Sequence, residues 1–180
     1  VITAPRTVTI DGNFTIPGIL SFTNNIAYSL VSAGSAPNTL TFDTSPSITF
    51  SGTANHSISA NLAFSNTVTI DQSNATATPT ISSTISGAGG LTKTGTGTLI
   101  MSGTSNYTGT TSFNGGTLQI ASSSNLGSGN FSFNGGTLQV SAPNVISYDI
   151  SLAGTGTLDT QSGTATYDGI ISGTGSLTTS

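Results

Sequence analysis

The chain has 180 residues, of which only 4% are charged, a formal net charge of −4 and no cysteine. This composition excludes a disulfide-dense scaffold and a thiolate metal centre. With only two basic residues, the chain also lacks the cationic surface that nucleic acids and anionic membranes require. Low charge alone would permit disorder, but 34% of the residues are hydrophobic and they are regularly spaced.

The first half of the chain contains short segments in which apolar and polar residues alternate. A period of two residues is typical of strands, and Thr, Val, Ile and Phe are common in these segments, which favours an all-β fold. The segments are TVTID at 7–11, the pairs Leu20/Phe22, Leu40/Phe42 and Leu62/Phe64, and a second TVTID at 67–71. We expect the two TVTID copies to occupy one register, three repeats apart.

In the second half of the chain, short sequence motifs recur, several of them at intervals near 20 residues. Gly, Asn and Ser clusters separate the alternating segments and supply the corners that short turns need. The recurring words are SGAGGL (86–91) and SGTGSL (172–177), GTGTL (95–99 and 154–158), and FNGGTLQ (113–119 and 133–139).

A fixed period of about 20 residues predicts a solenoid. Because each period is built from strands and turns, we expect an all-β, right-handed parallel β-helix with about nine coils. Residues 1–180 should form a single β-helical segment, with degenerate coils over 1–84 and regular ones over 85–180. The chain starts at Val1 and stops at Ser180 within the pattern, so we expect it to be part of a longer chain.

In a parallel β-helix, residues one period apart lie above one another, about 4.7–4.9 Å apart. Like side chains should therefore touch, with apolar columns inside and amide ladders outside or at corners. The expected inner pairs are Phe113/Phe133, Leu118/Leu138 and Ile120/Val140, and the expected ladders are Asn114/Asn134 and Gln119/Gln139.

Residues 85–129 carry a recognisable string of motifs. They read SGAGGLTKTGTGTL, then MSG (101–103), NYTG (106–109) and GGTLQI (115–120). This string resembles the autotransporter-associated β-strand repeat of bacterial type V secretion passengers. The resemblance covers about 85–180, and residues 1–84 share only the spacing.

The resemblance implies a right-handed β-helix on the bacterial surface or secreted, carried outside by a separate outer-membrane barrel. Such segments act as stalks, adhesins or self-associating fibres. We therefore expect a structural and adhesive stalk with no enzymatic activity and no cofactor. Its partners would be like chains or a host or cell-surface ligand, with neither nucleic acid nor direct membrane insertion of this segment.

Few residues could support catalysis. His56 is the single histidine, and we interpret it as a loop residue, because one His without Cys or Glu cannot build an ordinary zinc site. No G-x-S-x-G nucleophile motif is present. Lys93 lies in the LTK motif and Arg6 near the start of the chain, so no basic cluster accompanies the acids. A β-helical polysaccharide-acting enzyme is the alternative hypothesis.

Two pairs of acids are the remaining candidates. Asp11 and Asp71, three coils apart, would be about 14 Å from each other, too far for the paired carboxylates of a glycosidase. Asp149 and Asp168 each follow a tyrosine and are nineteen positions apart. On adjacent coils they could hold Ca²⁺ or serve as a catalytic pair, or they could simply be exposed corner residues.

A column of threonines raises one further alternative, an ice-binding solenoid. We expect one outward column with Thr at every position, and a second whose Ile, Gln and Asp interrupt the pair of Thr columns that an ice-binding face would need. The first column contains Thr39, Thr98, Thr117, Thr137 and Thr157, and the second contains Thr41, Ile100, Gln119, Gln139, Asp159 and Thr178.

Overall fold

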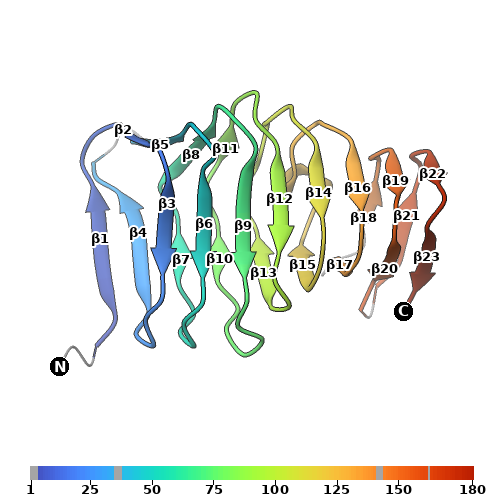
Figure 1. Cartoon of the computed structure of the whole chain (residues 1–180), viewed down its shortest axis with the longest axis horizontal. Coiled ribbons are helices and arrows are strands. Elements are labelled where there is room, and N and C mark those ends of the chain that lie inside the picture. The colour runs from blue at the N-terminus through green and yellow to red at the C-terminus, as the bar shows by residue number, and fades with distance from the viewer. Residues whose placement is uncertain (1–3, 35–37, 141–143, 162) are drawn as a thin grey trace.

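The computed structural model describes residues 4–34, 38–140, 144–161 and 163–180. The chain winds into a rod of stacked coils, with the N-terminus at one end and the C-terminus at the other (Figure 1). All the strand pairs are parallel, and partners belong to successive coils. The prediction of an all-β parallel β-helix is confirmed.

Two long sheets and two short ones form the sides of the coil. The nine-stranded sheet contains β1 (Arg6–Ile10), β4 (Tyr28–Ser32), β7 (Ser57–Ile58), β10 (Thr80–Ile81), β13 (Thr98–Met101), β15 (Thr117–Ile120), β17 (Thr137–Val140), β20 (Thr155–Asp159) and β23 (Ser176–Thr179). The eight-stranded sheet contains β3 (Ile19–Phe22), β6 (Ser47–Phe50), β9 (Val68–Gln72), β12 (Leu91–Thr94), β14 (Thr111–Phe113), β16 (Phe131–Phe133), β19 (Ile150–Leu152) and β22 (Ile171–Gly173).

The third side of the coil is covered by two separate short sheets. One contains β2 (Phe14–Ile16), β5 (Thr39–Phe42), β8 (Asn61–Phe64) and β11 (Ile85–Ser86), and the other contains β18 (Asn144–Ile146) and β21 (Ala165–Tyr167). Between them, residues 102–110 and 121–130 cross this side without a strand, and the second of these segments contains the 3₁₀ turn η1 (Ser123–Asn125).

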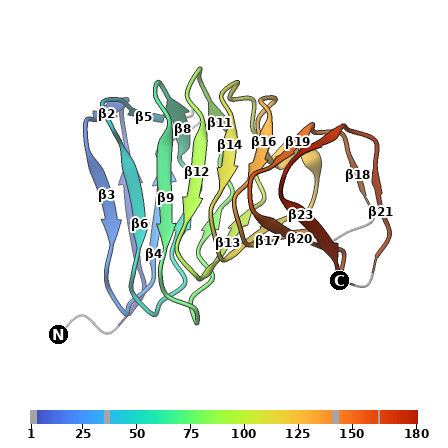
Figure 2. The same ribbon diagram turned by 45° about the vertical axis from the view of Figure 1, so that its right-hand side comes forward.

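The winding is right-handed. In Figure 1 the chain advances from left to right, and in the first coils it rises along β1 and β4 and descends in front along β3 and β6. Figure 2, turned toward the C-terminal end, shows the last coil running through β21, β22 and β23 in the same sense. The rod has about eight turns of about 21 residues, one turn fewer than the nine expected from the sequence.

The coils are longer in the first half than in the second. Ser57 and Ser29 are hydrogen-bonded neighbours 28 residues apart, and Thr94 and Asp71 are 23 apart. In the second half, Asn134 lies 20 residues above Asn114. This difference accounts for the weaker rhythm of the first 84 residues.

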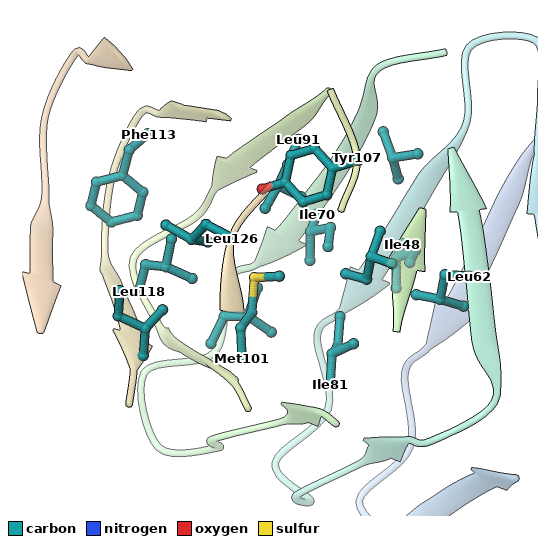
Figure 3. Packing of buried hydrophobic residues seen from close by; sticks show 14 of the residues in the cluster. Ile48, Leu62, Ile70, Ile81, Leu91, Met101, Tyr107, Phe113, Leu118 and Leu126 are labelled. Atoms are coloured by element: carbon teal, nitrogen blue, oxygen red, sulfur yellow. The ribbon is translucent and has the colours of Figure 1, made fainter. Parts of the chain in front are cut away.

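The core is a set of in-register apolar columns along the rod axis. Leu118 pairs with Leu138, Ile120 with Val140 and Phe113 with Phe133, as expected. All six side chains are buried, and Figure 3 shows Phe113 and Leu118 in the interior with Met101 and Leu91. Burying such a side chain stabilises the fold by about 1.5–3 kcal/mol.

The outer amide ladder is confirmed at one of its two predicted steps. The Asn134 side-chain Nδ2 donates to Asn114 Oδ1 at 2.7 Å. Gln119 and Gln139 are neighbours in the sheet register, and Gln139 Nε2 donates to Asp159 Oδ2 at 2.9 Å. The column therefore passes from amide to carboxylate, and the hydrogen bond from Gln139 lowers the pKa of Asp159.

The prediction that both TVTID copies share a register is wrong. The first copy lies in β1 of the nine-stranded sheet and the second in β9 of the eight-stranded sheet. The Leu-x-Phe pairs are likewise divided, because Leu20/Phe22 lies in β3 whereas Leu40/Phe42 and Leu62/Phe64 lie in the four-stranded sheet. The same apolar alternation suits a strand on any side of the coil, because every side buries its inner face. A repeated motif therefore does not show which sheet its strand belongs to.

The described residues include no helix long and apolar enough to span a bilayer.

The glycine pair at 115–116 offers a test of the close stacking at corners. Gly116 has φ +71°, and a Cβ there would lie 2.5 Å from the carbonyl oxygens of Gly95 and Gly97 in the preceding coil. A Cβ on Gly115 would lie 3.6 Å from its nearest neighbour, which is an ordinary contact. We expect Gly116→Ala to lower the free energy of unfolding by about 2 kcal/mol or more.

Gly115→Ala is the matched control and should change the free energy of unfolding by less than about 1 kcal/mol. Chemical denaturation of both variants measures the difference. Equal losses would mean that the corner does not depend on the backbone geometry of Gly116.

Candidate functional site

His56 is a structural residue of the first coils. It lies in a loop, as expected, but is only 1% exposed. Its Nδ1 accepts a hydrogen bond from the Tyr28 N–H at 3.2 Å, so the neutral ring carries its proton on Nε2, 3.3 Å from the Asn24 carbonyl oxygen. The ring lies 5.0 Å from that of Phe22. Burial lowers the pKa of His56, which favours this neutral, hydrogen-bonded form.

Lys93 lies inside the rod, which its sequence motif did not reveal. It occupies an inward position of β12, between Ile70 and Phe113 in the neighbouring coils, and is fully buried. Its ammonium group donates to the carbonyl oxygens of Thr94 at 2.6 Å, Gly95 at 3.2 Å and Gly115 at 3.3 Å. Lys93 thus ties together two successive glycine corners and is not available to an external ligand.

Burial lowers the pKa of the Lys93 ammonium from 10.5 to about 8, and the negative charge of Asp71 opposes this shift. Asp71 is held by the Thr94 hydroxyl, which donates to its Oδ1 at 2.8 Å. At neutral pH the charged form of Lys93 is therefore stabilised inside the rod by three carbonyl groups and one nearby carboxylate.

The predicted acid sites are placed as follows. Asp11 follows β1 and Asp71 lies in β9, so they belong to different sides of the coil and not to one column. Asp149 and Asp168 are both exposed, and both carboxylates act on the pKa of Tyr167, which burial and these charges raise to about 12. Asp149 Oδ1 accepts a hydrogen bond from the Ile170 N–H at 2.9 Å.

Asp149 and Asp168 therefore both lie near Tyr167, whose hydroxyl donates to the Tyr148 carbonyl oxygen. In the part of the chain that the structure describes, no three His, Cys, Asp or Glu side chains form a group that could hold a metal ion. Calcium binding by the Asp149/Asp168 pair stays a prediction that calcium titration can test.

The threonine column is regular over five strands but differs in membership from the expectation. Thr98, Thr117, Thr137, Thr157 and Thr178 are successive partners in the nine-stranded sheet, and the last two hydroxyls are 3.0 Å apart. Thr39 and Thr41 lie in β5 of another sheet, so assigning them to these columns was wrong, as was placing Thr178 in the second one. The neighbouring column still reads Ile100, Gln119, Gln139 and Asp159.

The surface of the described residues has a hollow at each of two places. One, of about 320 Å³, lies at the N-terminal coil and is lined by apolar residues of β1, β3 and β4, including Val8, Leu20 and Leu30. The other is a groove of about 430 Å³ on the third side of the coil, and we call it the seam groove. It is lined by Ser105, Asn106, Ser123, Ser124, Leu126, Gly127, Ser128, Ser147 and Tyr148.

One feature of the sequence marks the seam groove but was overlooked. Residues 121–130 read ASSSNLGSGN and lack the apolar alternation of the other segments. Asn125 closes this stretch: its Oδ1 accepts from the N–H groups of Ala121 and Ser122, and its Nδ2 donates to the Gly103 carbonyl oxygen at 3.1 Å. A break in the strand pattern thus coincides with a break in the third sheet.

The buried ammonium generates a pH prediction. Between pH 8 and 10.5 the unfolded chain holds a proton on Lys93 that the folded chain has lost, so the free energy of unfolding rises with pH in this window. From pH 7.5 to 9.5 we expect a gain of about 1–2 kcal/mol. Guanidinium denaturation at several pH values measures it.

Lys93→Met is the matched variant, because it keeps an unbranched chain but removes the titrating group. Its stability should stay level over the same pH range. A parallel rise in both proteins would show that Lys93 is not the source.

Comparisons with known proteins find similarity between part of this rod and an autotransporter. Residues 91–120 match the passenger-associated-transport-repeat family. Over 100 residues, or 54% of this chain, the sequence is 44% identical to the adhesin BmaC autotransporter of Brucella suis biovar 1 (strain 1330). The chain covers 3% of the length of that relative. No solved structure matches the present chain. The resemblance stated above is thereby confirmed: residues 91–120 form a repeat of the autotransporter passenger type.

Proposed function

We propose that this chain is a rigid, non-enzymatic stalk segment of an adhesive autotransporter-like protein at the bacterial surface. The observation that carries the proposal is the unbroken nine-stranded ladder, in which like residues stack from coil to coil. The passenger repeat over 91–120 and the similarity to an adhesin support it. A spacer of this kind holds binding regions away from the cell.

The mechanical basis is the direction of the hydrogen bonds. The strands of a parallel β-helix run across the rod, so the backbone bonds between coils run along its axis. Bending the rod therefore strains many of these bonds at once. A coil such as β15–β16 is joined to the next through two long sheets, which makes the rod stiff against bending.

Self-association belongs to the same proposal. The chain has two basic and six acidic residues, and its formal net charge is only −4. Long-range repulsion between rods is therefore weak, and the Ser and Thr faces can approach one another. Light scattering at high protein concentration tests this part, and a monodisperse monomer throughout would contradict it.

The absence of enzymatic activity is also testable. A panel of neutral and acidic polysaccharides should show no bond cleavage with this chain. Turnover that is lost on replacing Asp149 or Asp168 would favour the enzyme hypothesis instead. Surface location is tested on the full-length protein, by the protease sensitivity of this segment in intact cells.

A coil deletion tests the stalk itself. Removing residues 117–136 takes out one complete period, because Thr117 and Thr137 are register partners. Gly116 then joins Thr137, and β13 can pair with β17. We expect a folded rod whose maximum dimension in small-angle X-ray scattering is shorter by about 4.8 Å.

Removing residues 127–136 is the control. It takes out half a period and places the apolar face of β17 on the wrong side of the coil. We expect loss of the β-sheet circular dichroism signal or marked destabilisation. If both deletions behaved alike, the stacking of whole periods would not be what determines the fold.

A further inference from the structure

We propose that the seam groove binds a neutral carbohydrate chain. The groove lies where the third side of the rod passes from the four-stranded sheet to the β18–β21 sheet. Its residues come from three successive crossings of that side, at 105–106, 123–128 and 147–148. A ligand there would contact several coils at once. The inference goes beyond the stalk function, because a spacer needs no ligand.

The backbone around the groove is already paired. The Ser105 N–H donates to the Ser124 carbonyl oxygen at 2.8 Å, the Asn106 N–H to Ile85 at 2.8 Å and the Ser128 N–H to Tyr107 at 2.9 Å. An added peptide strand would find these donors occupied. What the groove offers to a ligand is its side chains.

Those side chains are hydroxyls and an amide. Five serines line the groove together with Asn106, and each hydroxyl can both donate and accept a hydrogen bond. The hydroxyls of Ser124, Ser128 and Ser147 and the amide of Asn106 belong to exposed residues, so they can hydrogen-bond to a polyhydroxylated ligand. Ser105 does not contribute in this way, because it is only 8% exposed and its Oγ is buried.

Tyr148 provides a fixed aromatic surface beside the hydroxyls. Its hydroxyl donates to the carbonyl oxygens of Ser123 and Leu126, and its ring lies 6.4 Å from that of Phe131, with an angle of 30° between the ring planes. Burial raises the pKa of Tyr148, so the phenol keeps the proton that anchors it. A ring held in this way loses little rotational freedom on binding, and the C–H face of a sugar ring can pack against it.

The charges decide between neutral and charged ligands. None of the nine lining residues is charged. Of the two cations in the chain, Lys93 is buried with its donors occupied, and Arg6 lies in β1 of the first coil. An anionic sugar would therefore lose its hydration without gaining a counter-charge. A cationic ligand would lack a carboxylate in the groove, so a neutral saccharide fits best.

The test uses chain 1–180 with defined trisaccharides. Chitotriose, cellotriose and maltotriose are the neutral probes, and sialyllactose and tri-galacturonate are the acidic ones. In NMR titrations we expect at least one neutral probe to shift the backbone amides of 123–128 and 147–148, with a dissociation constant roughly tenfold lower than that of either acidic probe. Failure of all three neutral probes to bind, shifts confined to other residues, or equal binding of acidic probes would overturn the proposal.

Variants locate the binding on the groove. Ser128 and Ser147 are exposed at its rim, and the double variant Ser128→Gln/Ser147→Gln fills it with larger side chains. We expect its affinity for the neutral probe to fall by about tenfold or more. Ser151→Gln is the control, because Ser151 is an exposed residue of β19 on the eight-stranded sheet, and its affinity should not change.

Equal affinity of the double variant and the control would overturn the assignment to the groove. The chain's folding and rod length are measured separately, by circular dichroism and small-angle scattering. A correctly folded rod without sugar binding would remove this inference alone, whereas a failed coil deletion would count against the stalk.

Discussion

The structure depends on the contact between one coil and the next. A single coil buries only a few apolar side chains, and most of that gain is offset by the entropy lost in ordering about 21 residues. Stability arises when Leu118 lies on Leu138 and Phe113 on Phe133, with the backbone ladder closed in the same step. Each coil is therefore stabilised by the coil before it and in turn stabilises the coil after it.

Buried polar groups occur where this stacking meets a corner, and several are satisfied by the chain itself. Lys93 caps carbonyl groups of two glycine turns, Asn125 closes the η1 turn, and the Tyr107 hydroxyl lies 2.6 Å from that of Thr111. Lys93, Asn125 and Tyr107 belong to the segments LTK (91–93), SSNLG (123–127) and NYTG (106–109). Part of the repeat thus encodes corners, and the apolar alternation encodes the sides.

The sequence was sufficient to predict the class of fold, its direction of stacking and the inner partners of the second half. The pairs Leu118/Leu138 and Asn114/Asn134 could be predicted because the sequence repeat of 20 residues equals the length of the coil there, so equivalent residues are register partners. Prediction from the sequence failed for the first half, where coil lengths vary and Asp11 and Asp71 fall on different sides. It also failed for Lys93, since a lysine in an alternating strand does not show which face it occupies. The seam groove was missed because it is formed by the absence of a strand.

The scarcity of charge has a consequence for the medium in which the rod works. Ions act on proteins chiefly by screening interactions between charged groups within a Debye length, about 8 Å at physiological ionic strength. This chain has eight formally charged side chains in 180 residues, and its stacking rests on apolar columns and neutral hydrogen bonds. Its shape and reach should thus be nearly the same in dilute fresh water and in brackish or physiological fluid.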